Sequence, residues 1–201
     1  SDLKNTGIKY AFISSDFVFD GQVGYYNENC KTSPVNEYGR QKVAVEEYIQ
    51  ANHPNDLIIR LSKVVGDSAH EEHFFSDCSK KVLQKLPIRC IKGQLFSPTY
   101  VKDVALGVIQ GFELNLSGLY HLTNSEFFYR DELARHFLLT IGVEVEVQAV
   151  PLEDFGFPER RPLKTYLDGT RFSMETGIHF TTMREVMDQF VERNLKIQHK
   201  Q

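Results

Sequence analysis

Short apolar runs alternate with helical patterns along this chain of 201 residues, and that alternation limits the possible folds more than any other feature. Parallel strands joined by crossover helices produce such a pattern. The periodicity predicts strands over residues 10–14, 57–60, 88–91, 118–122 and 143–150, and helices over 37–51, 73–84, 102–113 and 130–141, with a last helix from residue 182. The sequence therefore predicts an α/β fold built on a parallel sheet.

The first predicted strand ends in two serines, Ser14 and Ser15, and a polar loop then leads to a helix. In open α/β sheets, ligands bind at the carboxyl ends of the strands, so these hydroxyls are candidates for a functional site. Near the start of the helix, Tyr38 and Lys42 are four residues apart and would therefore share one helical face. We expect Ser15, Tyr38 and Lys42 to act together on a bound ligand.

These three side chains suggest proton transfer at a carbonyl group. A phenol is normally a poor acid at neutral pH, but a nearby ammonium favours the phenolate and would make Tyr38 a usable proton donor. The Ser15 hydroxyl can hydrogen-bond the substrate oxygen, which suggests proton transfer coupled to reduction or oxidation. Because any amphipathic helix can carry a Tyr-x-x-x-Lys pair, the pair alone does not establish catalysis.

Longer motifs around these residues resemble one enzyme family. The strand end reads Ser-Ser-Asp-Phe-Val-Phe-Asp-Gly over residues 14–21, and Pro-x-Asn-x-Tyr-Gly precedes the helix over residues 34–39. These motifs, with the segments at 60–66, 96–105, 118–122, 161–162, 167–168 and 176–178, make the chain similar to the extended short-chain dehydrogenase/reductases. Within that family it resembles dTDP-4-dehydrorhamnose reductase and its RmlD-like relatives over almost its whole length.

The resemblance implies an NAD(P)H-dependent reductase that acts on a nucleotide-linked 4-keto-6-deoxy sugar. Tyr38 would then donate the proton to the ketone, Lys42 would bind the nicotinamide ribose, and Ser15 would polarise the carbonyl. Ser62 and Lys63 would lie beside the nicotinamide of NADP or NAD. The implied fold is an incomplete Rossmann-type parallel sheet over residues 1–122 with a smaller C-terminal substrate-binding part over 123–201, the elements of the two being interleaved.

The resemblance also implies which residues contact the substrate. They are Asp16, Phe17, Val18, Phe19 and Arg161. Residues that follow a buried strand can instead belong to the core, and we weigh this alternative equally for Phe17 and Phe19.

Lys63 departs from the family pattern. The rhamnose enzymes tend to have an aromatic residue at the equivalent position, and this chain contains no tryptophan at all. A cation in place of a flat apolar wall predicts a substrate with an anionic or strongly hydrogen-bonding group near the reacting sugar.

The 13 glycines form no Gly-x-Gly-x-x-Gly or Gly-x-x-Gly-x-x-Gly motif, the turn that lets a backbone approach a pyrophosphate. In the family this turn lies upstream of the strand at 10–14, so we expect the chain to be the latter part of a longer protein. A sheet edge that the upstream unit would cover invites self-association. We therefore expect the isolated chain to bind NAD(P)H weakly, to lack reductase activity and to form homo-oligomers.

Composition argues against several other classes. A net charge of −4 with interspersed signs provides no basic field for nucleic acid, and no apolar run approaches the ~20 residues that span a bilayer. Cys30, Cys78 and Cys90 form no Cys-x-x-Cys motif and fit a reduced, cytoplasmic compartment. The histidines at 70 and 73 are too close together for a His-Glu-x-x-His metal site, and we predict a solvated loop there.

Two alternatives to an active reductase remain. The regulatory β subunit of methionine adenosyltransferase resembles this chain, including a Ser-Ser-Asp strand end, and acts by binding a partner enzyme. The chain could also be an inactive fragment of the reductase.

Overall fold

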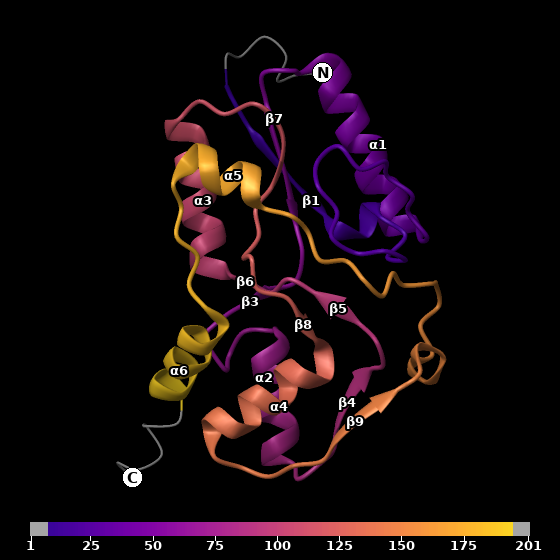
Figure 1. Ribbon diagram of the computed structural model, residues 1–201, viewed down its shortest axis with the longest axis vertical. Coiled ribbons are helices and arrows are strands. Elements are labelled where there is room, and N and C mark those ends of the chain that lie inside the picture. Colours follow the sequence, from indigo (N-terminus) through magenta and orange to yellow (C-terminus); the bar gives the residue numbers. More distant parts are fainter. Residues whose placement is uncertain (1–7, 195–201) are drawn as a thin grey trace.

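Three parallel strands form the main sheet in the computed structural model, which describes residues 8–194. β1 (Ala11–Ser15), β2 (Leu57–Leu61) and β7 (Gly118–His121) lie in the order β1-β2-β7, and Ile59 of β2 is paired with Ile13 and Tyr120. Every residue of β2 is buried, as expected for the middle strand of a parallel sheet. The sheet occupies the upper half of Figure 1.

Helices flank this sheet. α1 (Glu37–Asn52) packs against β1, while α5 (Thr170–Thr176) packs against β7 and α3 (Val101–Glu113). In Figure 1, α1 lies to the right of the strands, and α3 and α5 lie to the left. Because successive strand residues point to opposite faces, the odd-numbered residues of β2 join the apolar core that includes Phe172, whereas Arg60 reaches α1.

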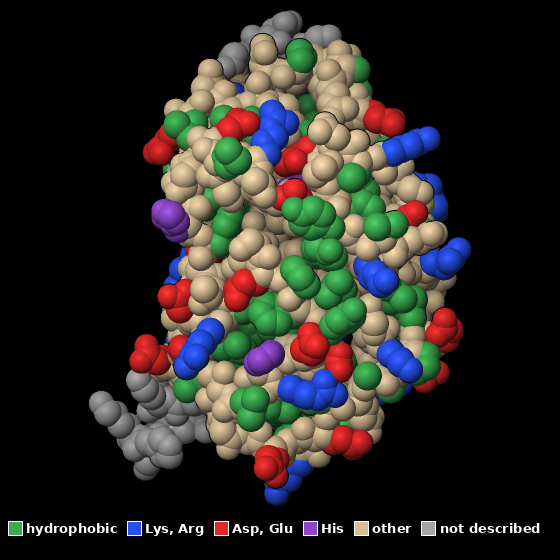
Figure 2. All heavy atoms as spheres, viewed as in Figure 1, with side chains coloured by type: hydrophobic (Ala, Val, Ile, Leu, Met, Phe, Trp, Pro, Cys, Tyr) green, Lys and Arg blue, Asp and Glu red, His purple; other side chains and the backbone are tan. Residues whose placement is uncertain are grey.

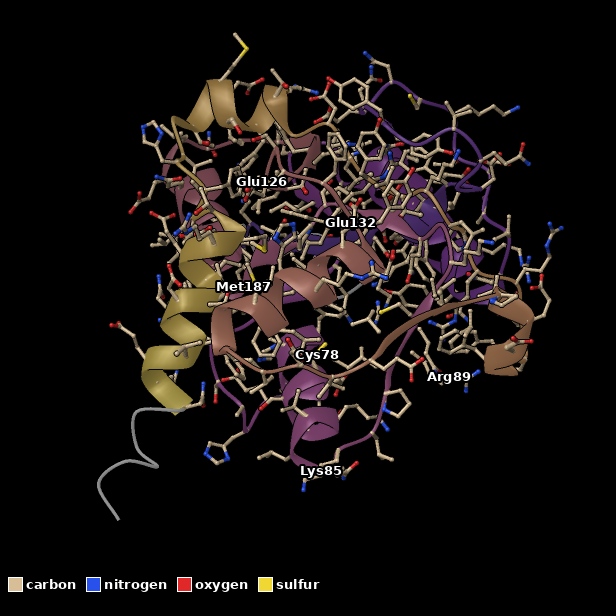
Figure 3. All side chains as sticks on the ribbon, turned by 60° about the horizontal axis from the view of Figure 1, so that its bottom comes forward. Cys78, Lys85, Arg89, Glu126, Glu132 and Met187 are labelled. Carbon is tan, nitrogen blue, oxygen red and sulfur yellow. The ribbon has the colours of Figure 1, made fainter. Side chains whose placement is uncertain are left out.

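A second region lies in the lower half of Figure 1. It consists of two strands paired in parallel and three helices: β4 (Ile88–Ile91), β9 (Val147–Val150), α2 (Phe74–Leu83), α4 (Arg130–Ile141) and α6 (Met183–Asn194). Buried apolar side chains from these elements form one core. Figure 3 shows Cys78 of α2 close beneath α4, and Met187 on the side of α6 that faces α4.

Short segments join the two regions. β3 (Val64–Val65) pairs in parallel with β6 (Thr99–Tyr100), and β5 (Leu95–Phe96) pairs antiparallel with β8 (Phe128–Tyr129). Two 3-10 helices follow strands: η1 (Asp16–Val18) comes directly after β1, and η2 (Leu152–Phe155) comes after β9.

A glycine allows α1 to begin close to the end of β1. The Asn36 side chain caps the helix by accepting a hydrogen bond of 2.8 Å from the Gly39 backbone N–H. A Cβ atom at Gly39 would overlap the carbonyl oxygen of Phe17 in η1. The first turn of α1, which carries Tyr38, therefore lies directly against η1.

The expected α/β class with a parallel sheet is confirmed. The predicted strands and helices are present with small shifts at their ends, except that the strand expected from residue 143 begins at Val147. The sequence pattern missed α5, which has only seven residues. The predicted solvated loop is wrong at His73, because that side chain is buried and its Nε2 lies 2.8 Å from the carbonyl oxygen of Ser68.

Each core contains elements from both sides of residue 122. α2 and β4 precede that residue and join the core of the lower region, whereas α5 follows it and packs against the main sheet. The chain therefore passes between the two regions several times.

Candidate active site

A pocket of about 360 Å³ lies at the carboxyl ends of β1 and β2, the edge where ligands bind in open α/β sheets. Main-sheet, helix and loop residues line it together: Ser15, Asp16, Phe17, Tyr38, Ser62, Lys63, Val64, Gln94, Phe96, Arg130, Arg161 and Thr165. The fold thus brings most of the predicted site residues to one hollow, although they are far apart in the sequence.

Three predicted site residues lie outside this lining. Val18 and Phe19 are fully buried, because η1 turns the chain inward after Phe17 and places both in an apolar cluster with Tyr26. The structure therefore does not bring Val18 and Phe19 to the pocket, although both were expected there. Lys42 lies one helical turn behind Tyr38.

Ser15 caps η1, and its hydroxyl group makes two hydrogen bonds. Its Oγ accepts a hydrogen bond of 3.2 Å from the Phe17 backbone N–H and donates one of 3.0 Å to Asp16 Oδ1. The Ser62 hydroxyl donates to the other carboxylate oxygen, Asp16 Oδ2, at 3.0 Å. Two serine hydroxyls thus converge on one carboxyl group at the pocket wall.

Asp16 is the buried acid of the pocket, with 6% of its surface exposed. Desolvation by burial raises its pKa to about 6, although hydrogen bonds from Thr165, Ser15 and Ser62 favour the ionised form and limit that rise. A buried carboxyl group with a raised pKa in the same pocket lining as Tyr38 is a candidate for a functional role.

Tyr38 and Lys42 lie on the same face of α1, as their spacing predicts. Tyr38 is half exposed, and its ring meets the Phe17 ring edge-on with 5.8 Å between centroids. Lys42 Nζ lies 5.5 Å from the centroid of the Tyr38 ring and donates a hydrogen bond of 2.9 Å to the carbonyl oxygen of Ile13. The hydrogen bond to the β1 backbone therefore holds the Lys42 ammonium group close to the Tyr38 ring.

A buried ion pair joins α1 to the middle of the sheet. Arg60 contacts Glu46 with two hydrogen bonds of 2.6 and 2.9 Å, and Ser14 also donates to Glu46. Arg60 Nη1 further lies 3.4 Å from Nε2 of His121, whose pKa is lowered to about 3 by burial and by Arg60, so that this imidazole is neutral. Glu46 comes one turn after Lys42, and the pair thus fixes the helix that carries Tyr38.

Three cationic side chains line the pocket: Lys63, Arg130 and Arg161. Lys63 is exposed at the rim, yet desolvation and the nearby Arg130 lower its pKa. Arg161 lies over the ring of Phe157, with 3.7 Å from the guanidinium carbon to the ring centroid. Away from the pocket, Figure 2 shows acidic and basic side chains interspersed over the face in view, with no single-sign field.

The loop that carries Arg161 is tied to the start of α1. Asn36 Nδ2 donates to the carbonyl oxygen of Arg160 at 3.1 Å, and the Glu37 backbone N–H donates to Glu159 at 3.0 Å. These two hydrogen bonds therefore fix the loop that carries Arg161 relative to Tyr38 at the start of α1.

Sequence reasoning missed Arg130, Gln94 and Thr165 as site residues. Arg130 was expected only as the start of a helix, but its backbone N–H donates to the Gln94 carbonyl oxygen at 2.9 Å and its side chain lines the pocket. No local pattern marks these three residues, because only the fold brings them near Ser15.

Neither a metal centre nor a membrane helix is found in residues 8–194. No three His, Cys, Asp or Glu side chains among them are grouped so that they could hold a metal ion. None of the helices that they form combines the length and the apolar character needed to cross a bilayer.

Comparisons with known proteins identify the family. The model of the RmlD substrate binding domain matches residues 2–196. The spore coat polysaccharide biosynthesis protein SpsK of Bacillus subtilis is 32% identical over 187 residues, which are 92% of this chain and 65% of SpsK. The β subunit of methionine adenosyltransferase 2 from Xenopus tropicalis is 30% identical over 129 residues, which are 61% of this chain and 39% of that protein.

Solved structures give the same result. The crystal structure of dTDP-4-dehydrorhamnose reductase from Bacillus anthracis, in complex with NADP, superimposes with a TM-score of 0.83 at 26% identity. The match covers 94% of this chain and 66% of that structure, so the chain spans just under two thirds of the length of SpsK and of this reductase. On the family model and these similarities, the chain belongs to the RmlD substrate-binding domain family.

Proposed function

We propose that this protein is an NAD(P)H-dependent reductase of a nucleotide-linked 4-keto-6-deoxy sugar. One observation carries the proposal: Ser15 and Tyr38 border the same pocket at the carboxyl ends of β1 and β2, with Lys42 behind Tyr38. The NADP-bound reductase among the similar structures supports the nicotinamide cofactor.

The residues present suit such a cofactor on one side of the pocket. Tyr38 and Lys42 offer a hydroxyl and an ammonium, and Ser62 and Lys63 offer the same two groups from the segment after β2. These four residues would hold the nicotinamide and its ribose, and the cofactor would supply the hydride.

The chain's own residues would handle the proton. Tyr38 would donate it to the developing alkoxide, and Lys42 would stabilise the phenolate that remains. Ser15 would hydrogen-bond the ketone oxygen, and Phe17 would orient the Tyr38 ring through their edge-on contact. Asp16 and Arg161, which also line the pocket, would contact the substrate.

Neighbouring hollows support a substrate larger than a single sugar ring. A space of about 800 Å³ shares Arg161 with the pocket, and another of about 470 Å³ shares Arg130 and also contains Lys80, Lys81 and Arg89. In Figure 3, Arg89 points toward η2, where its guanidinium lies over Phe155. Arginine and lysine side chains of this kind suit the phosphates of a nucleotide.

We also propose that the nucleotide-binding part and the substrate-binding part are interleaved in sequence. Residues 1–122 would supply most of the first part and residues 123–201 most of the second, with α2, β4 and α5 exchanged between them. The composition of the two cores supports this division.

A cytoplasmic location and homo-oligomerisation complete the proposal. Cys30, Cys78 and Cys90 are free thiols, which suits a reducing compartment. Within residues 8–194, β1 pairs with β2 alone, and the exposed apolar side chains of Ile13, Val45 and Tyr48 lie on β1 and α1. Light scattering on the purified protein would test self-association.

The direct test is turnover of dTDP-4-dehydrorhamnose by the full-length protein, followed through the absorbance of NADPH or NADH. We expect substrate-dependent cofactor oxidation. A protein that binds the cofactor but reduces no 4-keto nucleotide sugar would refute the reductase.

A regulatory role is the second candidate, because of the 30% identity to the methionine adenosyltransferase subunit. Binding to a methionine adenosyltransferase would test this role. Failure of both tests would leave the third reading, an inactive fragment of the reductase.

Lys63 provides a test of substrate choice. We predict that Lys63→Met lowers kcat/KM for substrates with an anionic group near the keto sugar by roughly 10- to 100-fold, the scale of a hydrogen bond to a charged group. Neutral analogues should change little. Lys31→Met is the matched control, because Lys31 is exposed and does not line the pocket. Equal selectivity of the Lys63→Met variant and the unmodified protein would show that Lys63 faces solvent.

A further inference from the structure

The Ser15 hydroxyl donates its hydrogen to Asp16 Oδ1. A serine hydroxyl has one hydrogen to donate and two lone pairs with which to accept. One lone pair of Ser15 Oγ accepts from the Phe17 N–H, and the hydrogen goes to Asp16 Oδ1. An ionised carboxylate can only accept hydrogen bonds, so the Ser15 hydrogen stays in its bond to Asp16. In this state Ser15 has none left for a ketone oxygen.

One proton on Asp16 reverses this arrangement. A protonated Oδ1 would donate to the second lone pair of Ser15 Oγ, while Oδ2 would still accept from Ser62. The Ser15 hydrogen would then be free to turn into the pocket, and the bond from Phe17 would remain. Once a ketone oxygen accepts that hydrogen, all of these donors and acceptors are paired.

Resting on the proposed reductase function, we infer that Asp16 is a positioning residue that directs the Ser15 hydroxyl, which can polarise the substrate ketone only while Asp16 holds a proton. Asp16 acts through Ser15 and transfers no proton to the substrate. Its role therefore differs from that of Tyr38, which would supply the proton itself.

The charged and titratable groups around the pocket determine when Asp16 is protonated. Burial favours the neutral acid and raises its pKa to about 6. Lys63 after β2 interacts electrostatically with Asp16 and favours the carboxylate, as do the hydrogen bonds from Thr165, Ser15 and Ser62. Arg130 at the start of α4, Arg161 on its loop and Tyr38 of α1 are the other charged or titratable groups of the lining. A bound anionic substrate would offset these cations, so substrate binding should favour the protonated, active arrangement.

The sign of the pH dependence follows from this assignment. Asp16 is protonated below its pKa, so the contribution of Ser15 is present there and is lost as the pH rises through about 6 in the free protein. The value of kcat/KM, which reports groups of the free enzyme, should fall across this range.

Asp16→Asn is the decisive variant. Its amide can donate to Ser15 and accept from Ser62 at any pH, so it imitates the protonated acid. We expect the kcat/KM of this variant to show no fall near pH 6, whatever level of activity it retains. Ser62→Ala removes a hydrogen bond that favours the carboxylate, so it should move this fall to higher pH. Thermal melting of each variant reports whether it is folded.

A spectroscopic titration gives a readout that does not depend on turnover. The infrared carboxylic-acid band that is missing in Asp16→Asn should titrate near pH 6, and Ser15→Ala should move that titration upward. An active protein whose pH profile is unchanged in a folded Asp16→Asn variant would overturn the inference and leave the reductase standing. A protein without reductase activity would refute the proposed function, whereas the infrared band would still decide whether Ser15 donates to Asp16.

Discussion

Replacing Tyr38 with phenylalanine should lower turnover of the full-length protein by roughly two to four orders of magnitude, the range of general acid catalysis. The substitution removes only the phenolic oxygen, so the ring can keep its edge-on contact with Phe17. Lys42 also keeps its hydrogen bond to the Ile13 carbonyl oxygen. Steady-state kinetics on a 4-keto nucleotide sugar, together with calorimetry of NADPH binding, would separate lost chemistry from lost binding.

The same helix offers a matched control. Tyr48 is half exposed on α1, as Tyr38 is, but it does not line the pocket. Tyr48→Phe should therefore retain full turnover. A Tyr38→Phe variant that turns over its substrate at the original rate would eliminate Tyr38 as the acid.

The second large effect concerns stability. Arg60→Met should lower the free energy of unfolding by about 3–5 kcal/mol, because it leaves Glu46 as an uncompensated buried charge. Both side chains are 3% exposed, so water cannot replace the lost partner. Ser14 would still donate to Glu46, but one neutral hydroxyl does not balance a buried carboxylate. Urea unfolding followed by circular dichroism would measure the change.

Two further variants test the cause of this loss. In the double variant Arg60→Met with Glu46→Leu no buried charge is left, and most of the stability should return. Arg171→Met is the surface control, because the Arg171–Glu175 pair is about half exposed and should contribute less than about 1 kcal/mol. A loss below that value in Arg60→Met would show that the buried pair does not hold α1 on the sheet.

Local periodicity accounts for what the sequence could predict. Strand β2 is a continuous apolar run apart from Arg60, and the spacing of four residues between Tyr38 and Lys42 is enough to place both on one helical face. The serines at the end of β1 could be assigned to the ligand-binding edge, because parallel strands present their carboxyl ends there. These features depend on residues that are near one another in the chain.

What the sequence could not predict depends on distant contacts. Arg60 and Glu46 look like an isolated cation and an ordinary helix residue until the fold brings them together. The inward turn of η1, which buries Phe19 but leaves Phe17 at the pocket, has no periodic signature in a three-residue helix. The direction of the Ser15 hydrogen bond likewise depends on the carboxyl group that it meets.

The pairing of β4 with β9 limits how such a protein can evolve. Consider a recombination event that exchanged everything after residue 122. The original β4 would then have to pair with a β9 from another protein. The original main sheet would likewise have to pack against a foreign α5. Descendants of that exchange would carry two mismatched cores. New substrate preferences in this lineage should therefore arise by single substitutions around the pocket, and Lys63 is a position where one change alters charge without disturbing either core.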